Sequence, residues 1–217
     1  MRLFAVVWMA FFPIALAGCG RDAADRPAGR SLSVPHTHRG ERPIRAVCTT
    51  GMIADLVRNV GGDLVRVEQL MGADVDPHLY KATFADVRKL NDADVIFSNG
   101  LHLEGKMAEA LAEMARRKPV FPVAEFLPAT SILTDERGLP DPHVWMDVSL
   151  WSDGAGIVAQ ALALYDPDKA DTYRAQADLY RKQLADLHEE TRSKLASIQP
   201  ERQRLLVTSH DAFRYFG

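Results

Sequence analysis

The sequence predicts an α/β protein in which two βα lobes are joined by a long rigid helix, with the second lobe only begun. Between positions 44 and 123, short apolar strands alternate with helical stretches of about ten residues, a pattern typical of βαβ units and a mostly parallel sheet. A helical stretch then runs from 166 to 199, and a new strand pattern follows it. The composition is 47% hydrophobic and 25% charged over 217 residues, which is enough apolar material for one or two packed domains.

The first lobe is expected over residues 44–165, and local signals set its elements. Gly61 and Gly62 end the first helix, because glycine favours helix ends, and Pro119 ends the third, because proline cannot continue a helix. A loop over 125–147 leads to an apolar helix over 150–165. The expected strands are 44–50, 64–71, 95–98 and 120–123, and the expected helices between them are 51–60, 83–91 and 105–118.

The next helix is expected over 166–199, with Asp166 as its N-cap and Pro167 in its first turn. About 32 residues at 1.5 Å each form a rod of roughly 48 Å, longer than a compact domain of this size needs. We interpret the rod as a connector between two lobes, with a free coiled coil as the alternative. Residues 204–209 are the next expected strand and 210–216 begin a helix, so 200–217 is expected to start the second lobe.

The first 18 residues have the pattern of a secretory signal peptide. One basic residue precedes about fifteen apolar ones, a run shorter than the about 20 residues that span a bilayer as a helix. Leu16-Ala17-Gly18-Cys19 resembles a lipoprotein cleavage site, so Cys19 is the candidate for lipidation and membrane anchoring on the periplasmic or cell-surface side. The alternative is an ordinary secretory signal followed by a chance cysteine. Residues 19–43 are poor in bulky apolar residues and are expected to be a flexible tether, whereas Cys48 is expected to be a buried free thiol.

Composition and missing motifs exclude several functions. With 26 basic and 29 acidic residues the formal charge is −3, so nucleic acid is not an expected partner. The chain has no His-Glu-x-x-His motif, no phosphate-binding Gly-Lys-Ser/Thr loop and no Gly-x-Ser-x-Gly motif. A binding protein is therefore expected rather than an enzyme, with a metal-dependent hydrolase as the alternative.

Three histidines indicate a divalent metal site. The sequence Asp-Pro-His occurs twice, at Asp76-Pro77-His78 and at Asp141-Pro142-His143, each time in a connection outside the expected strands. Proline stiffens both loops, and each carboxylate could orient the loop or bond to a ring nitrogen, as the partners of metal-binding histidines do. His210 directly follows the expected strand 204–209, again at the edge of the sheet where α/β proteins bind ligands. We therefore expect His78, His143 and His210 to bind a divalent metal.

The other histidines are weaker candidates. His36 and His38 lie in the expected tether and are interpreted as solvated, although transient metal collection is the alternative. His102 is expected to form a structural hydrogen bond near the cleft, and His188 to lie on the surface of the long helix. Trp145 is expected to wall the site with apolar bulk rather than to touch a ligand.

Several ordered motifs in residues 44–217 resemble those of the zinc- and manganese-binding solute-binding lipoproteins of bacterial metal ABC importers (periplasmic solute-binding protein family 9). The two Asp-Pro-His motifs and the candidate lipidation site at Cys19 belong to this resemblance. It also includes Thr49-Thr50-Gly51-Met52-Ile53-Ala54-Asp55, Asn99-Gly100-Leu101-His102-Leu103-Glu104, Val144-Trp145-Met146-Asp147 and Ser209-His210-Asp211-Ala212-Phe213.

The resemblance implies metal capture between two lobes and delivery to an ABC-type membrane permease. By position, His78 and His143 would be ligands from the first lobe and His210 the first ligand from the second. The family's fourth ligand is a carboxylate near the end of the second lobe, so it is expected beyond residue 217 in a chain that looks truncated. Zinc or manganese would be the cargo: three imidazoles favour zinc, whereas residues 124–140 lack the histidine-rich loop usual in zinc-dedicated relatives. Surface adhesion is a further alternative, since some relatives have been assigned that role.

Overall fold

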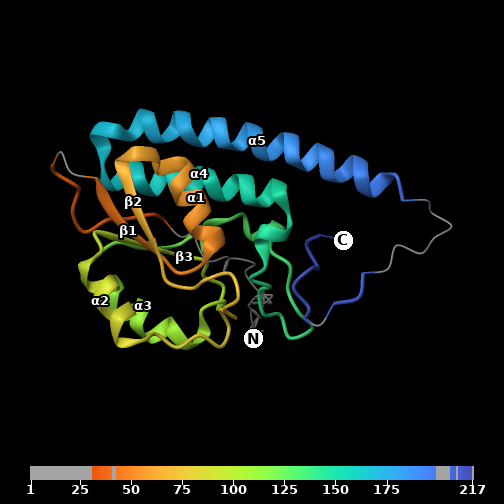
Figure 1. The fold of residues 1–217 in the computed structure, drawn as a ribbon, viewed down its shortest axis with the longest axis horizontal. Coiled ribbons are helices and arrows are strands. Elements are labelled where there is room, and N and C mark those ends of the chain that lie inside the picture. Colours follow the sequence, from red (N-terminus) through yellow and green to blue (C-terminus); the bar gives the residue numbers. More distant parts are fainter. Residues whose placement is uncertain (1–30, 41–42, 199–205, 209, 217) are drawn as a thin grey trace, which may run out of the picture.

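The computed structural model describes residues 31–40, 43–198, 206–208 and 210–216, and their core is a parallel sheet between two helical layers (Figure 1). The sheet consists of β1 (Ile44–Cys48), β2 (Val65–Gln69), β3 (Val95–Ser98) and β4 (Val120–Pro122) in the order β2-β1-β3-β4. All three strand pairs are parallel. The predicted α/β class with a parallel sheet is therefore confirmed.

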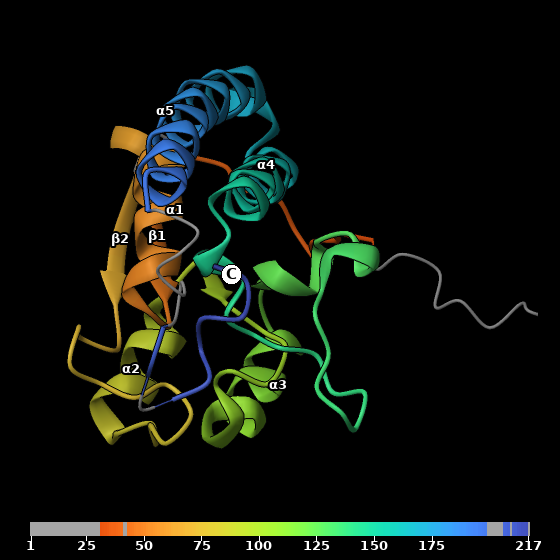
Figure 2. The same cartoon turned by 90° about the vertical axis from the view of Figure 1, so that its right-hand side faces the viewer.

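The two faces of the sheet are buried against different helices. Figure 2 shows α1 (Gly51–Gly61), α4 (Val148–Tyr165) and α5 (Ala170–Ala196) on one side, and α2 (Phe84–Asp92) and α3 (Ala108–Ala115) on the other. Within β3, Val95 and Phe97 belong to the core under α1 and α4, and Ile96 to the core on the other face. This alternation follows from the two-residue period of a strand, and burial on both faces explains why the strand sequences are continuously apolar.

The strand order opens a crevice at the edge of the sheet where the strands have their carboxyl ends. The connection after β1 forms α1 on one face, whereas the connections after β2 and β3 place α2 and α3 on the other face. Loops that leave β1 and β3 therefore diverge, and in open α/β sheets ligands bind where such loops separate at the carboxyl ends of the strands. Thr49 and Thr50 follow β1 at this edge, and Asn99 follows β3.

Capping residues set the helix bounds close to those expected. The Thr50 hydroxyl accepts the Ile53 N–H at the start of α1, so β1 ends at Cys48 rather than at position 50. Thr83 and Asp86 form a capping box at the start of α2. Gly62 ends α1 with φ +50°, in the left-handed region that glycine adopts without strain. The expected helix over 105–118 begins as a 3-10 turn, Gly105–Met107, and continues as α3.

The long helix is also present. A 3-10 turn, Pro167–Lys169, precedes α5, which runs back along α4, and the Tyr173 hydroxyl donates to Asp166 at the turn (2.8 Å). The buried side chains of α5 are Tyr173, Ala177 and Leu184, so the residues after 184 do not contribute to the core. Figure 1 shows this end of α5 extending beyond α4. The helix is thus a packed element in its first half and an exposed rod in its second.

The expected strand over 204–209 and the helix after it are not found. Residues 206–208 have no regular secondary structure, residues 210–216 form bends and a turn, and positions 204, 205 and 209 lie outside the described residues. A strand is stable only when another strand pairs with it, and here residues 210–216 contact the 133–141 loop through side chains instead. The hydrophobic pattern of residues 204–209 predicts a strand, but it does not show whether another strand lies beside it.

The described part of the expected tether packs on the core. Leu32 and Val34 are partly buried against it, and the His38 N–H donates to the Tyr165 carbonyl (2.5 Å). The rings of His36 and His38 each lie 5.9 Å from that of Tyr165. Leu32, Val34 and His38 are thus partly buried, whereas the other residues of this segment, His36 included, are exposed.

Of the two cysteines, Cys48 lies among the described residues and Cys19 does not. Cys48 is a fully buried free thiol, as expected, and burial raises its pKa far above the usual range. Cys19 and the expected signal peptide lie outside the described residues. Among the helices that are described, none has both the length and the apolar character needed to cross a membrane.

Candidate metal centre

Three imidazoles meet at the crevice edge of the sheet. His78 comes from the connection between β2 and α2, His143 from the loop before α4, and His210 from the C-terminal segment. Each offers one ring nitrogen, and these nitrogens all lie within 4.8 Å of one another. The ring centroids are 5.3 Å apart for His78 and His143, 5.3 Å for His78 and His210, and 4.9 Å for His143 and His210. The structure thus brings together the three histidines singled out from the sequence.

The two Asp-Pro-His motifs adopt the same local geometry. In each, one carboxylate oxygen accepts the backbone N–H of the histidine two residues later, at 2.9 Å from Asp76 to His78 and 3.0 Å from Asp141 to His143. This is the Asx turn that aspartate forms readily, and the intervening proline restricts the loop further. The Asx turn and the proline therefore restrict the backbone at both histidines.

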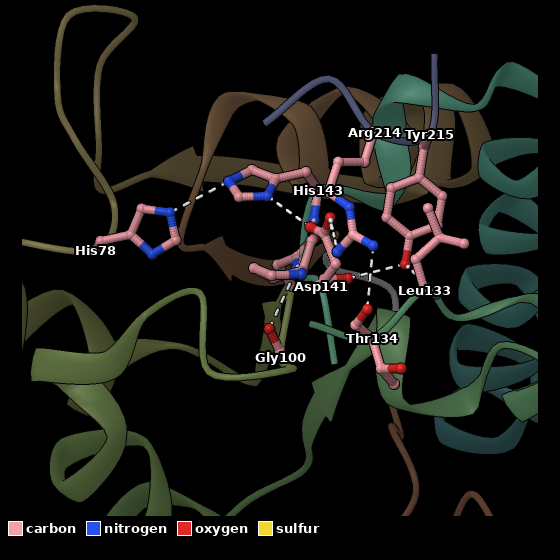
Figure 3. Close-up of polar contacts among 10 residues, drawn as sticks. His78, Gly100, Leu133, Thr134, Asp141, His143, Arg214 and Tyr215 are labelled. Atoms are coloured by element: carbon pink, nitrogen blue, oxygen red, sulfur yellow. Dashed lines mark hydrogen bonds and ion pairs between the residues drawn. The ribbon is translucent and has the colours of Figure 1, made fainter. Parts of the chain in front are cut away.

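The second motif also fixes the orientation of the ring. Asp141 Oδ1 lies 2.7 Å from His143 Nδ1, and both side chains are almost fully buried. When the carboxylate is ionised, Nδ1 carries the proton and donates it in this bond, so Nε2 keeps its lone pair. Figure 3 shows His143 between Asp141 and His78, and its Nε2 lies 3.2 Å from His78 Nε2.

The surroundings of the first motif's imidazole favour its neutral form. Removal from water lowers the pKa of His78, the neighbouring His143 lowers it further, and the charge of Asp76 opposes both effects. A neutral ring is the form that binds a metal. Of the three histidines, His143 is buried, His78 is partly buried and His210 is exposed.

One pair of these nitrogens has nearly the spacing of two ligands on a tetrahedral ion. Zinc–nitrogen bonds of about 2.1 Å at tetrahedral angles place two ligand nitrogens about 3.4 Å apart. His78 Nε2 and His143 Nε2, at 3.2 Å, already have nearly this separation. In the part of the chain that the structure describes, no carboxylate oxygen joins the three nitrogens in this cluster.

A buried glutamate that sequence reasoning did not single out holds the crevice together. Glu104 accepts hydrogen bonds from the Thr49 hydroxyl (2.6 Å), the Asn99 N–H (2.7 Å) and the Gly100 N–H (3.1 Å). Burial raises its pKa, and these bonds oppose that rise. The carboxylate thereby joins the ends of β1 and β3, the two strands whose loops diverge.

The same network extends to the second motif. The Asn99 amide donates to the carbonyl of Pro142 at 3.0 Å, directly before His143. Gly100, Leu101 and His102 have φ values of +82°, +51° and +65°, so the chain curls around the Glu104 carboxylate in a conformation rarely adopted by non-glycine residues. In the sequence, the signal for this role of Glu104 is the position of a charged residue directly after apolar Leu103.

The remaining candidates lie outside the cluster. His102 is exposed on the strained loop, and His188 lies on α5. Trp145 contacts the His143 ring at a centroid distance of 5.3 Å and, with Trp151 and Met52, lines a cleft of about 850 Å³ that contains the three histidines. Trp145 therefore forms an apolar wall of the site.

Comparison with known proteins identifies the family. The model described as ZnuA, zinc-uptake complex component A periplasmic, matches residues 46–217. The chain is 41% identical over 218 residues to the manganese-binding lipoprotein MntA of Bacillus subtilis (strain 168), which covers 100% of this chain and 67% of that protein. It is 44% identical over 171 residues to the zinc-binding protein TroA of Treponema pallidum (strain Nichols), which covers 79% of this chain and 55% of that protein. The chain belongs to this zinc-uptake component family, which confirms the resemblance seen in its motifs.

Solved structures share the fold. The periplasmic zinc-binding protein TroA from Treponema pallidum superposes with a TM-score of 0.77 at 43% identity, over 81% of this chain and 63% of that one. Fe(III)-bound YtgA from Chlamydia trachomatis gives a TM-score of 0.72 at 31% identity, over 80% of this chain and 61% of that one. In these four alignments, to three proteins, the chain thus spans between 55% and 67% of the other protein's length.

The buried carboxylate provides a test of how the crevice is held. Glu104→Gln replaces one acceptor oxygen with an NH₂ group that faces N–H and O–H donors, so at least one buried donor loses its partner. The free energy of unfolding should fall by about 2–4 kcal/mol in urea denaturation. Glu109→Gln, on the exposed surface of α3, is the control and should change it by less than about 0.5 kcal/mol. Equal stability of the two variants would contradict this role of Glu104.

Proposed function

We propose that this protein captures a divalent metal, zinc or manganese, on the extracytoplasmic side of a membrane and delivers it to an ABC-type permease. The observation that supports this most directly is the group of three imidazole nitrogens within 4.8 Å, supplied by His78, His143 and His210. Names of relatives agree, among them a manganese-binding lipoprotein, a zinc-binding protein and a manganese ABC transporter substrate-binding lipoprotein. Anchoring through lipidated Cys19 is part of the proposal.

Binding fits the site better than catalysis. A hydrolase would need a free general base beside the metal-bound water. The carboxylates of the two Asp-Pro-His motifs are engaged, since Asp76 accepts the His78 N–H and Asp141 accepts two bonds from His143. The matched relatives are named as metal-binding and transport components. An open site that holds the ion and releases it is therefore favoured.

The donor set favours zinc over manganese. Neutral imidazole is a preferred ligand of zinc, whereas manganese prefers carboxylate, carbonyl and water oxygens. The three side chains of the cluster offer nitrogen alone. We expect zinc to bind this chain more tightly than manganese, with water or a further oxygen ligand completing the shell.

Removal of a single ligand tests the assignment. His78→Ala and His143→Ala should each weaken zinc binding by at least tenfold, because the loss of even an indirect partner of a metal ligand costs about that much. Competition titration with a chromophoric chelator, with zinc and with manganese, measures the change. His188→Ala, on α5, is the matched control and should bind as the unaltered chain does. Unchanged affinity in both site variants would reject this assignment.

Acid should release the metal. Protons and metal compete for the same nitrogen lone pair, and the lowered pKa of His78 delays this competition until the solution is acidic. Affinity should stay level from pH 8 to about 7 and fall as the pH drops below about 6, because the pKa of His78 lies below the ordinary imidazole value of about 6.5. The same chelator titration across pH 5–8 measures this. Constant affinity over the whole range would indicate carboxylate ligands instead of imidazoles.

A further inference from the structure

The segment that carries His210 also contacts the loop that carries His143. Residues 210–216 lie beside the 133–141 loop, and two side chains near the end of the segment form the contacts (Figure 3). These side chains are Arg214 and Tyr215, four and five residues after His210. Sequence reasoning gave neither residue a role.

Tyr215 bridges the two ends of the loop. Its hydroxyl donates to the Asp141 carbonyl at 2.9 Å and accepts the Leu133 N–H at 3.0 Å. One phenol thus uses both its donor and an acceptor position on backbone groups eight residues apart in the sequence. Such a paired contact fixes the hydroxyl more strictly than a single hydrogen bond does.

Arg214 contacts the same loop at two further points. Its Nη2 donates to the Thr134 carbonyl at 3.1 Å, and its Nη1 lies 3.7 Å from Asp141 Oδ2. Within the described residues, Oδ2 accepts no hydrogen bond, although the Asp141 side chain is almost fully buried. The Arg214 guanidinium is therefore placed to compensate a buried negative charge.

The carboxylate of Asp141 thereby contacts both the loop that carries His143 and the segment that carries His210. Oδ1 accepts both the backbone N–H and the ring bond of His143, and Oδ2 faces Arg214. We propose that Arg214 and Tyr215 are positioning residues, which bring His210 to the metal by binding its segment to the Asp141 loop. This inference rests on the proposed metal-binding function of the three histidines.

The physical reason is the cost of ordering an exposed ligand. His210 is exposed, and Ala212 is the buried residue of its segment. Restricting each backbone residue costs roughly 1–2 kcal/mol, so a ligand on an unrestrained segment must offset that cost when the metal binds. Contacts made by Arg214 and Tyr215 before the metal arrives remove part of this cost, which raises the effective concentration of the His210 imidazole at the site.

A double-mutant cycle on the full chain tests whether Tyr215 acts through His210. Tyr215→Phe removes the hydroxyl and keeps the ring. It should weaken zinc binding about tenfold when His210 is present, and less than about twofold in a His210→Ala background. Tyr173→Phe is the control: it also removes a phenol hydroxyl, one that donates to Asp166 at the other end of α4. This control should leave zinc affinity unchanged.

Arg214 is tested by conservative rescue. Arg214→Gln should weaken zinc binding in the same way as Tyr215→Phe, and Arg214→Lys should restore part of the loss because it retains the positive charge facing Asp141. Cobalt can be substituted for zinc to report on the ligand shell. Its visible spectrum should shift on Tyr215→Phe toward that of His210→Ala, which a loss of stability alone would not produce.

A readout without metal separates this inference from the proposed function. The Leu133 amide should exchange slowly with deuterium in the metal-free protein and at least tenfold faster in Tyr215→Phe. Failure of the unaltered chain to bind either zinc or manganese would reject the proposed function. Tight zinc binding that Tyr215→Phe leaves unchanged, or weakens equally with and without His210, would reject the positioning role alone, as would fast exchange at Leu133 in the unaltered chain.

Discussion

The carboxylate of Asp141 is the point on which the geometry of the candidate site depends. It accepts the backbone N–H of His143 at 3.0 Å and faces the ring nitrogen at 2.7 Å, so one group sets both the loop and the orientation of the imidazole. Its second oxygen lies 3.7 Å from Arg214. A buried carboxylate is stable only with partners of this kind, and here those partners are the elements that bring the ligands together.

The sheet determines where this arrangement can form. Strands β1 and β3 are neighbours whose connections leave toward opposite faces, which opens a crevice at their carboxyl ends. Glu104 joins the two strand ends through Thr49 and Asn99, and Asn99 binds the Pro142 carbonyl next to His143. The strand order thus provides the crevice. Glu104, through its bond to Asn99, holds the Asp141-Pro142-His143 loop beside that crevice.

Sequence reasoning succeeded where local signals decide the outcome. Continuous apolar runs and glycine or proline stops located the strands and helices of residues 44–165, and the repeated Asp-Pro-His pattern located two of the clustered histidines. It failed where partners distant in sequence decide: residues 206–208 pair with no strand in the described part of the chain, and Leu32 and Val34 of the expected tether cover apolar surface. The role of Glu104 depends on Thr49, 55 residues earlier, and no local pattern shows such a contact.

The central proposal is that three neutral imidazoles bind one ion. Zinc X-ray absorption spectroscopy of the zinc-loaded chain counts those ligands directly, because imidazole rings give characteristic multiple scattering. The structure predicts three imidazoles at zinc–nitrogen distances of about 2.0–2.1 Å, with an oxygen ligand completing the shell. A shell with one imidazole or none, dominated by oxygen or sulfur, would contradict the site formed by His78, His143 and His210.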